Sequence, residues 1–315
     1  MSDLLWLLFF LFIIFVAWFA VGGPAKADFG SLFLQSPGGI FNASSTPGAG
    51  VSTSTDWFPV SYPGSGGGTA NPGNPLTADP AFTDALNQLK NTPSQAQGSV
   101  VFNALYGAQA TDPSKEFIEI QANQSNPTSI NISGWRIQSM KTGRMAVIGT
   151  AIETPLSGQG GTPGAVVLMP GERAEIVTGR SPTGTSFRVN KCSGYFGQFQ
   201  TFTPALAPLC PSALGELYAS GGQLSSENAC VMAAAKIGPC RVLTGPPTNV
   251  SSTCGQFLTR VLSYNSCVQL HQNDSDFRQN EWRIYEGNVS ELWVSTGDTL
   301  VLLDQRGRLV SSTSY

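Results

Sequence analysis

The sequence predicts an all-β fold, a β-sandwich that carries a disulfide-rich, partly helical insert and follows an N-terminal transmembrane helix. Two groups of short apolar runs with period-two character predict the sandwich, one around Glu116–Ile137 and the other at Gly297–Tyr315. Gly, Asn, Asp or Ser bounds these runs, as is typical of strands joined by turns. A long apolar run near the N-terminus and six clustered cysteines predict the remaining parts.

The first group of runs predicts seven strands: Val100–Tyr106, Glu116–Ala122, Ser129–Ile132, Trp135–Ser139, Met145–Thr150, Ala165–Leu168 and Arg173–Thr178. Side chains alternate between the two faces of a strand, so we expect Ile118 and Ile120 to face the core and Glu119 to face solvent. Trp135 follows the tight Ser133-Gly134 turn and is large enough to anchor the core. A ligand-stacking role is the alternative for this ring.

Leu4–Val21 is a run of 18 consecutive apolar residues. As a helix it spans about 27 Å, close to the hydrocarbon thickness of a bilayer. A run so uniformly apolar has no polar face to show to water, which disfavours a soluble helix. The run predicts a membrane anchor within residues 1–27; a cleaved signal segment is the alternative, because Ala25-Lys26-Ala27 resembles a small-x-small cleavage site.

Residues 28–78 are rich in Gly, Ser, Thr and Pro with almost no charge, so we expect a linker that buries too little apolar surface to order itself. Residues 79–97 hold a short helix and a connector. The helix is predicted over Pro80–Lys90, where Asp79 caps the first turn and Phe82, Ala85, Leu86 and Leu89 share one face. The sandwich then occupies residues 98–315, with the insert at about 187–281.

The charge balance argues against nucleic acid as a partner. From residue 98 onward the chain carries 15 basic and 15 acidic residues, so the globular part is neutral. A protein that follows a duplex needs a basic field to neutralise phosphates. The positive-inside count gives no clear orientation for the anchor, since Asp3 lies on one side and Lys26 on the other.

The cysteines indicate the compartment. All six lie in one stretch, and their even number and wide spacing predict a disulfide set formed in an oxidising compartment: Cys192, Cys210, Cys230, Cys240, Cys254 and Cys267. We therefore expect the globular part outside the cytoplasm. Pairing of nearest neighbours is the simplest scheme, but six cysteines allow 15 connectivities and the sequence does not choose among them.

Within the insert, helices are predicted over about Ser226–Lys236 and Thr253–Tyr264, with a third near Ser266. The single histidine, His271, follows Cys267 by four residues, so the two could share a helical face and form a Cys–His nucleophilic pair. A disulfide at Cys267 would exclude this pair. An enzyme would need a polar constellation here, made of His271, Asp274, Asp276 and Glu281. The same acidic residues lack the spacing of an EF-hand, so we predict no catalytic residues, no cofactor and no metal.

Several segments occur in the order seen in a known family. Besides the strands above, Met169-Pro170-Gly171-Glu172 and the run from Ala174 to Val177 take part. Over about residues 98–180 and 282–315 the chain resembles the lamin tail domain, a small immunoglobulin-like β-sandwich. Asn190–Tyr195 and Asn280–Tyr285 are similar to segments of cysteine-bearing inserts in lamin-tail proteins of small-genome bacteria. An insert of about 100 residues departs from the family pattern.

This resemblance implies a bacterial source and a binding or scaffolding role instead of catalysis. Together with the anchor and the cysteines it predicts a single-pass membrane protein whose C-terminal domain lies outside the cytoplasm. The expected partners are the membrane, through residues 4–21, and an unknown protein or cell-envelope component. The alternatives are a homo-oligomeric, self-assembling cell-surface subunit, or an enzyme with its site in the insert.

Overall fold

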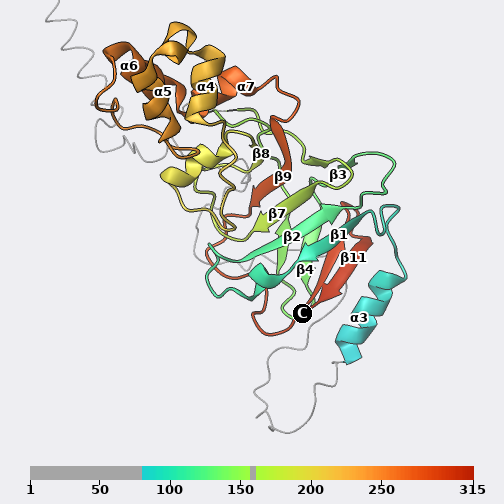
Figure 1. Ribbon diagram of the computed structural model, residues 1–315. Helices are drawn as coiled ribbons and strands as arrows, with labels where there is room; N and C mark the ends of the chain where they lie inside the picture. The colour runs from blue at the N-terminus through green and yellow to red at the C-terminus, as the bar shows by residue number, and fades with distance from the viewer. Residues whose placement is uncertain (1–79, 157–160) are drawn as a thin grey trace, which may run out of the picture. The chain divides into compact units, whose positions relative to one another are not determined.

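The structure is a computed structural model that describes residues 80–156 and 161–315 (Figure 1). Its strands are β1 (Val100–Ala104), β2 (Phe117–Ala122), β3 (Ile130–Asn131), β4 (Arg136–Ser139), β5 (Met145–Val147), β6 (Val167–Leu168), β7 (Arg173–Val177), β8 (Phe187–Asn190), β9 (Arg278–Tyr285), β10 (Thr299–Leu303) and β11 (Leu309–Ser314). They form a five-stranded sheet in the order β1-β2-β7-β9-β8, a four-stranded sheet in the order β11-β10-β4-β5, and the small pair β3-β6.

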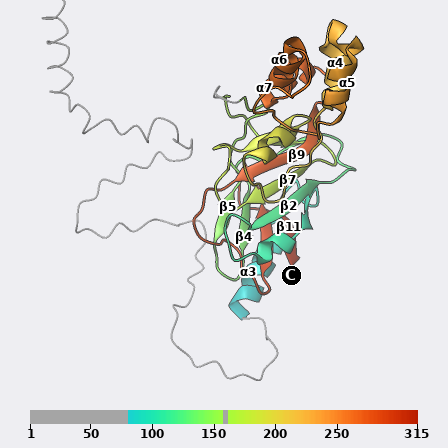
Figure 2. The ribbon, with the colours of Figure 1, turned by 60° about the vertical axis from the view of Figure 1, so that its left-hand side comes forward.

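The helices lie before and between these strands. The α-helices are α3 (Pro80–Lys90), α4 (Ala213–Ser220), α5 (Asn228–Ala235), α6 (Ser252–Val261) and α7 (Tyr264–His271), and the 3₁₀ helices are η1 (Tyr106–Gln109), η2 (Ser193–Gln198) and η3 (Gly222–Ser226). Four of the α-helices gather beyond the β8–β9 end of the sheets, whereas α3 lies at the other end (Figures 1 and 2).

The prediction of an all-β, immunoglobulin-like β-sandwich is wrong. β9 pairs with β7 in parallel, with Arg173 opposite Glu281 and Val177 opposite Tyr285, so the larger sheet is mixed. The helices make up a substantial part of the described chain, which is therefore a mixed α and β structure. The predicted N-terminal transmembrane helix lies outside the described residues; within 80–156 and 161–315, no helix is long and apolar enough to cross a membrane.

The two larger sheets share one hydrophobic core. The larger sheet contributes alternate residues of β2, β7 and β9, and the smaller sheet contributes alternate residues of β4 and β10: Ile118, Ile120, Ala174, Ile176, Trp282, Ile284, Ile137, Leu300 and Leu302. Trp135 lies in this core at 5% exposure. Burial of each large apolar side chain contributes about 1.5–3 kcal/mol, so this layer supplies most of the driving force for folding.

Helix α3 covers the other face of the smaller sheet. Ala85, Leu86 and Leu89 are packed against a cluster formed by Met140, Val301, Leu303 and Leu309. The helix has the bounds that the sequence predicts, and these three members of its apolar face make the expected contacts. Asp79, the predicted cap, lies outside the described residues.

The segment between β8 and β9, residues 191–277, builds its own layer with two small cores around its cysteines. Serine side chains begin three of its helices: Ser212 accepts from the Gly215 amide at 3.0 Å, Ser251 from Cys254 at 3.1 Å and Ser263 from Ser266 at 3.3 Å. The sequence did not predict α4, β8 or β9. We call residues 191–277 the insert from here on.

Candidate functional site

The six cysteines lie in three bonded pairs within the insert and its ends. Cys192 pairs with Cys267, Cys210 with Cys240 and Cys230 with Cys254. Nearest-neighbour pairing, the simplest of the 15 schemes that the sequence leaves open, does not occur, because the helices fold back on one another and bring distant residues together. All six sulfur-bearing residues are buried.

Gly194 is required beside the Cys210–Cys240 bridge. A Cβ atom at this position would collide with Cys240 Sγ and lie 3.0 Å from the Ala207 carbonyl oxygen. A side chain here would have to displace the Cys210–Cys240 bridge or the backbone beside it. The first turn of η2 thus packs directly on sulfur.

His271 bridges two helical segments of the insert. Its Nε2 lies 2.6 Å from Glu216 Oε1 on α4, and its Nδ1 lies 2.8 Å from Asp274 Oδ2. Although partial burial lowers the pKa of His271, its hydrogen bonds to the two carboxylates outweigh that effect and raise it. When the ring is protonated, both nitrogens donate to carboxylates, and the imidazolium then has no lone pair with which to abstract a proton or ligate a metal.

The acidic residues predicted around this histidine divide into two places. Asp274 and Asp276 both bind the Lys191 ammonium group, at 2.8 and 2.5 Å, and Asp274 also contacts His271, as the sequence suggests. Glu281 lies on β9 instead, where it binds Arg173 and Arg283. Cys267 is bonded to Cys192 and has no thiol to offer. In the part of the chain that the structure describes, no group of three or more His, Cys, Asp or Glu residues is arranged to hold a metal ion.

The outer face of the larger sheet carries a buried cluster of carboxyl and guanidinium groups that the sequence did not predict. Glu119 lies opposite Glu175 in the β2–β7 ladder, and Glu175 lies opposite Arg283 in the β7–β9 ladder. Arg173 and Glu281 form the next row. Glu119 is only 7% exposed, so the expectation that it faces solvent is wrong. Arg283 donates to the carbonyl oxygens of Pro204 and Ala205 in the insert, which covers this face.

Burial and proximity give Glu175 an unusual protonation state. Desolvation and a hydrogen bond to Glu119 raise the pKa of Glu175 to about 8, against the opposing effect of the Arg283 charge. The neutral Glu175 carboxyl is the donor of this hydrogen bond. The period-two spacing of charges on β9 was a signal for this cluster, but only the fold shows that the face is covered.

Two hollows open on the insert. The larger, of about 910 Å³, is bordered by α4, η3 and α6, and it is lined by polar and apolar side chains such as Gln223, Phe257 and Arg260. The smaller, of about 320 Å³, is bordered by η2 and the start of α7, and four of its eight lining residues are aromatic. The Cys192–Cys267 bridge connects the two elements that border the smaller hollow, since η2 begins after Cys192 and α7 contains Cys267.

Comparison with known proteins gives no family for this chain. No protein-family model matches the sequence, and no curated protein matches it. The resemblance to the lamin tail domain stays a prediction. The function therefore has to be argued from the chain's own residues.

Proposed function

We propose that this protein is an extracytoplasmic binding or scaffolding protein, held at a membrane through residues 4–21, in which the insert presents the recognition surface. The observation that carries the proposal is the set of three buried disulfides confined to the insert and its ends. Such bridges form and persist in oxidising compartments, and they rigidify segments that have only small cores. A surface that is rigid before it meets its partner binds with a smaller loss of entropy.

The position of the insert supports a role in recognition that is separate from the stability of the sheets. β8 and β9 are antiparallel neighbours, and Asn190 lies opposite Arg278, so the insert leaves and re-enters the sheet at adjacent points. The sequence of the insert can therefore change to suit a different binding partner with little effect on the register of the sheets. The groups that an enzyme would need, His271, Asp274 and Asp276, are engaged with Glu216 and Lys191.

The self-assembling subunit is less well supported. Self-assembly through a sheet requires an edge strand with free amide groups. At β5, an edge of the smaller sheet, the Val147 amide donates to Glu286 Oε2 at 3.0 Å and is not available to a second copy. Light scattering on the full chain in detergent distinguishes the two ideas, because a strict monomer contradicts self-assembly.

Sequential thiol labelling of cells tests the proposal. Intact cells first receive a membrane-impermeant maleimide, then a second maleimide after lysis in denaturant, and a third after reduction. We expect all six native cysteines to react only in the third step. Denaturant is needed because bridges as buried as Cys192–Cys267 resist reduction in the folded protein.

A matched variant reports the side of the membrane directly. Ser312 is exposed on β11, far in sequence from the insert, and Ser312→Cys should react with the impermeant reagent on intact cells. Reaction of Ser312→Cys only after lysis would place the domain in the cytoplasm and overturn the proposed location. Reaction of the native cysteines in the second step would overturn the disulfides themselves.

A further inference from the structure

The smaller hollow of the insert has the lining of a small-molecule site. Four aromatic residues, Tyr195, Phe196, Phe199 and Tyr264, line it together with polar side chains that include Gln200. None of its lining residues carries a charge. At about 320 Å³ it lies at the lower end of the size range of small-molecule pockets, roughly 300–1,000 Å³. We call it the aromatic pocket.

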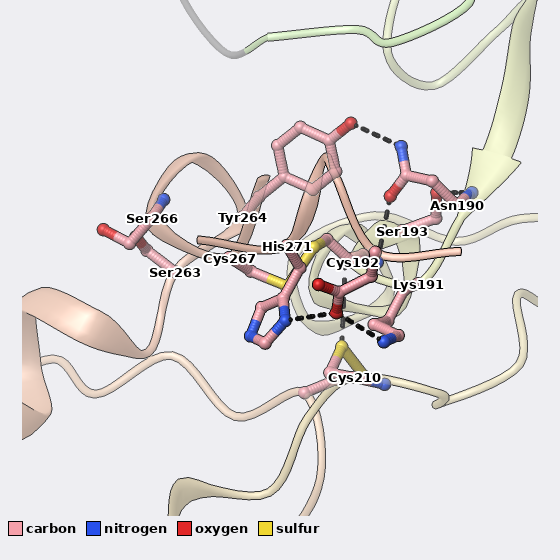
Figure 3. The surroundings of a disulfide bond; sticks show 12 residues. Asn190, Lys191, Cys192, Ser193, Cys210, Ser263, Tyr264, Ser266, Cys267 and His271 are labelled. Atoms are coloured by element: carbon pink, nitrogen blue, oxygen red, sulfur yellow. Dashed lines mark hydrogen bonds and ion pairs between the residues drawn. A yellow bond between two sulfur atoms is a disulfide. The ribbon is translucent and has the colours of Figure 1, made fainter. Parts of the chain in front are cut away.

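Covalent and hydrogen bonds fix the walls of the aromatic pocket. The Cys192–Cys267 bridge joins the start of η2 to α7. Gln198 pairs twice with the backbone of Val242, accepting at 2.7 Å and donating at 3.1 Å, which holds a third wall against η2. The Tyr264 hydroxyl accepts from Asn190 Nδ2 at 3.0 Å (Figure 3). The pocket is therefore formed before any ligand arrives.

Two features of the aromatic pocket have no role in stabilising the fold. Gln200 Oε1 is buried, and no group of residues 80–156 and 161–315 donates a hydrogen bond to it. A buried acceptor without a donor destabilises the folded state. Phe199 is 65% exposed although it is a large apolar residue. Because Gln200 lines the pocket, a rotation of its side chain would bring the buried Oε1 to a donor group of a ligand. A ligand that pairs with Gln200 in this way and covers Phe199 would satisfy both.

We propose that the aromatic pocket binds a neutral sugar ring. The C–H groups of a sugar ring carry a small positive charge and pack on the negative faces of aromatic rings, and a ring hydroxyl donates to Gln200 Oε1. A purely apolar ligand would leave Gln200 unpaired, and a charged ligand would find no opposite charge in the lining. This inference deepens the proposed binding function and rests on it, because a domain outside the cytoplasm is in contact with the sugars of a cell envelope.

Saturation-transfer NMR on the full chain tests the proposal. The chain is purified with its disulfides formed, in a detergent without a sugar headgroup, and mixed with glucose, galactose, mannose, N-acetylglucosamine or N-acetylgalactosamine at millimolar concentration. We expect saturation transfer to at least one of them, strongest at ring C–H protons. A trisaccharide of the same ring that binds at least tenfold more tightly assigns the end of a glycan as the source, and equal affinity assigns the free sugar. Absence of transfer to all five sugars overturns the proposal.

Two variants separate binding from folding. Phe199→Ala removes an exposed ring, and Gln200→Leu removes the unpaired acceptor with little change in size. We expect each to weaken sugar binding at least tenfold, while Gln200→Leu keeps or raises the thermal midpoint. The control is Tyr218→Ala, which removes an equally exposed aromatic residue outside the pocket and should leave binding unchanged.

Sugar binding that survives both Phe199→Ala and Gln200→Leu would overturn the assignment to this pocket. Failure of sugar binding leaves the thiol-labelling result intact, and a cytoplasmic location leaves the NMR result intact. The two proposals therefore fail separately.

Discussion

The buried carboxyl pair on the larger sheet predicts that the protein becomes less stable as the pH rises from acid to neutral and mildly alkaline values. Glu175 is 3% exposed, and its folded-state pKa of about 8 lies well above the ordinary value of 4.5. Between these two values the folded chain holds one proton that the unfolded chain has lost. By proton linkage, the stabilisation from Glu175 is complete below about pH 4.5 and is lost as the pH rises through 8.

Glu175→Gln should remove this dependence. An amide is neutral at every pH, has nearly the same shape and can still donate to the Glu119 carboxylate. One proton of difference corresponds to a slope of about 1.4 kcal/mol per pH unit. The free energy of unfolding of the native chain should therefore fall, relative to that of the variant, by about 3.5 kcal/mol from pH 5 to pH 8, since the slope is smaller near each of the two pKa values. At pH 8 the variant should be the more stable protein.

Urea denaturation at pH 5, 6, 7 and 8, with the disulfides intact, measures this difference. The quantity to compare is the difference between the native chain and the variant in the slope of the free energy of unfolding against pH. This difference isolates Glu175, because the pKa values of His271 and Glu286 are also shifted in the folded state. Asp84→Asn, which neutralises an exposed carboxylate on α3, is the control and should leave the slope unchanged. The reasoning is refuted if Glu175→Gln has the native slope, or if it is destabilised at every pH, since either result means that Glu175 is ionised and paired with Arg283.

Three further predictions concern the insert. Replacing Cys192 and Cys267 together by Ala should lower the free energy of unfolding by about 4 kcal/mol, measured by urea denaturation, because the loop they close is about 41 residues along the path through the other two bridges; an unchanged midpoint would contradict this. Gly194→Ala should cost about 1–3 kcal/mol by crowding the Cys210–Cys240 bridge, whereas Gly197→Ala, with open space around its Cα, should cost much less in the same thermal melts. His271 has a raised pKa, so its stabilisation is present below about pH 6.5 and is lost as the pH rises through its higher folded value; thermal melts of His271→Gln should therefore differ more from the native chain at pH 6 than at pH 9, and an equal difference at both would show that no charge is involved.

Local patterns predicted most of the strands that contribute to the core but not the strand that completes the larger sheet. β2, β4, β7, β10 and β11 overlap the segments that alternate apolar and polar residues. β9 also alternates, with Trp282 and Ile284 on the core face, but Glu281 and Arg283 made its other face look exposed. A charged face is buried here because the opposite charges and the insert lie beside it, and neither neighbour can be found from spacing along the chain.

The sequence predicted that the insert contains disulfides, but it predicted neither which cysteines pair nor where a pocket lies. The number and clustering of the cysteines predicted a bonded set, yet their partners depend on how α4–α7 pack. The aromatic pocket had no sequence signal at all, because Gln200 and Tyr264 are 64 positions apart and each has an ordinary local context. The solvent exposure of Phe199 and the missing partner of Gln200 are properties of the fold alone.

The disulfides of the insert also serve the sheet. β9 lies between β7 and β8, so the larger sheet is complete only when a strand that follows the 87 residues of the insert returns beside β8. Closing a flexible loop of that length is opposed by chain entropy, but the Cys192–Cys267 bridge shortens the path from Asn190 to Arg278 to about 13 residues and lowers the cost by about 1.7 kcal/mol. The bridge that joins η2 to α7, the two elements on either side of the aromatic pocket, is thus the bridge that brings Arg283 back to Glu175. Reduction of the Cys192–Cys267 bridge should therefore loosen the aromatic pocket and the outer face of the larger sheet together, because this one bridge supports both.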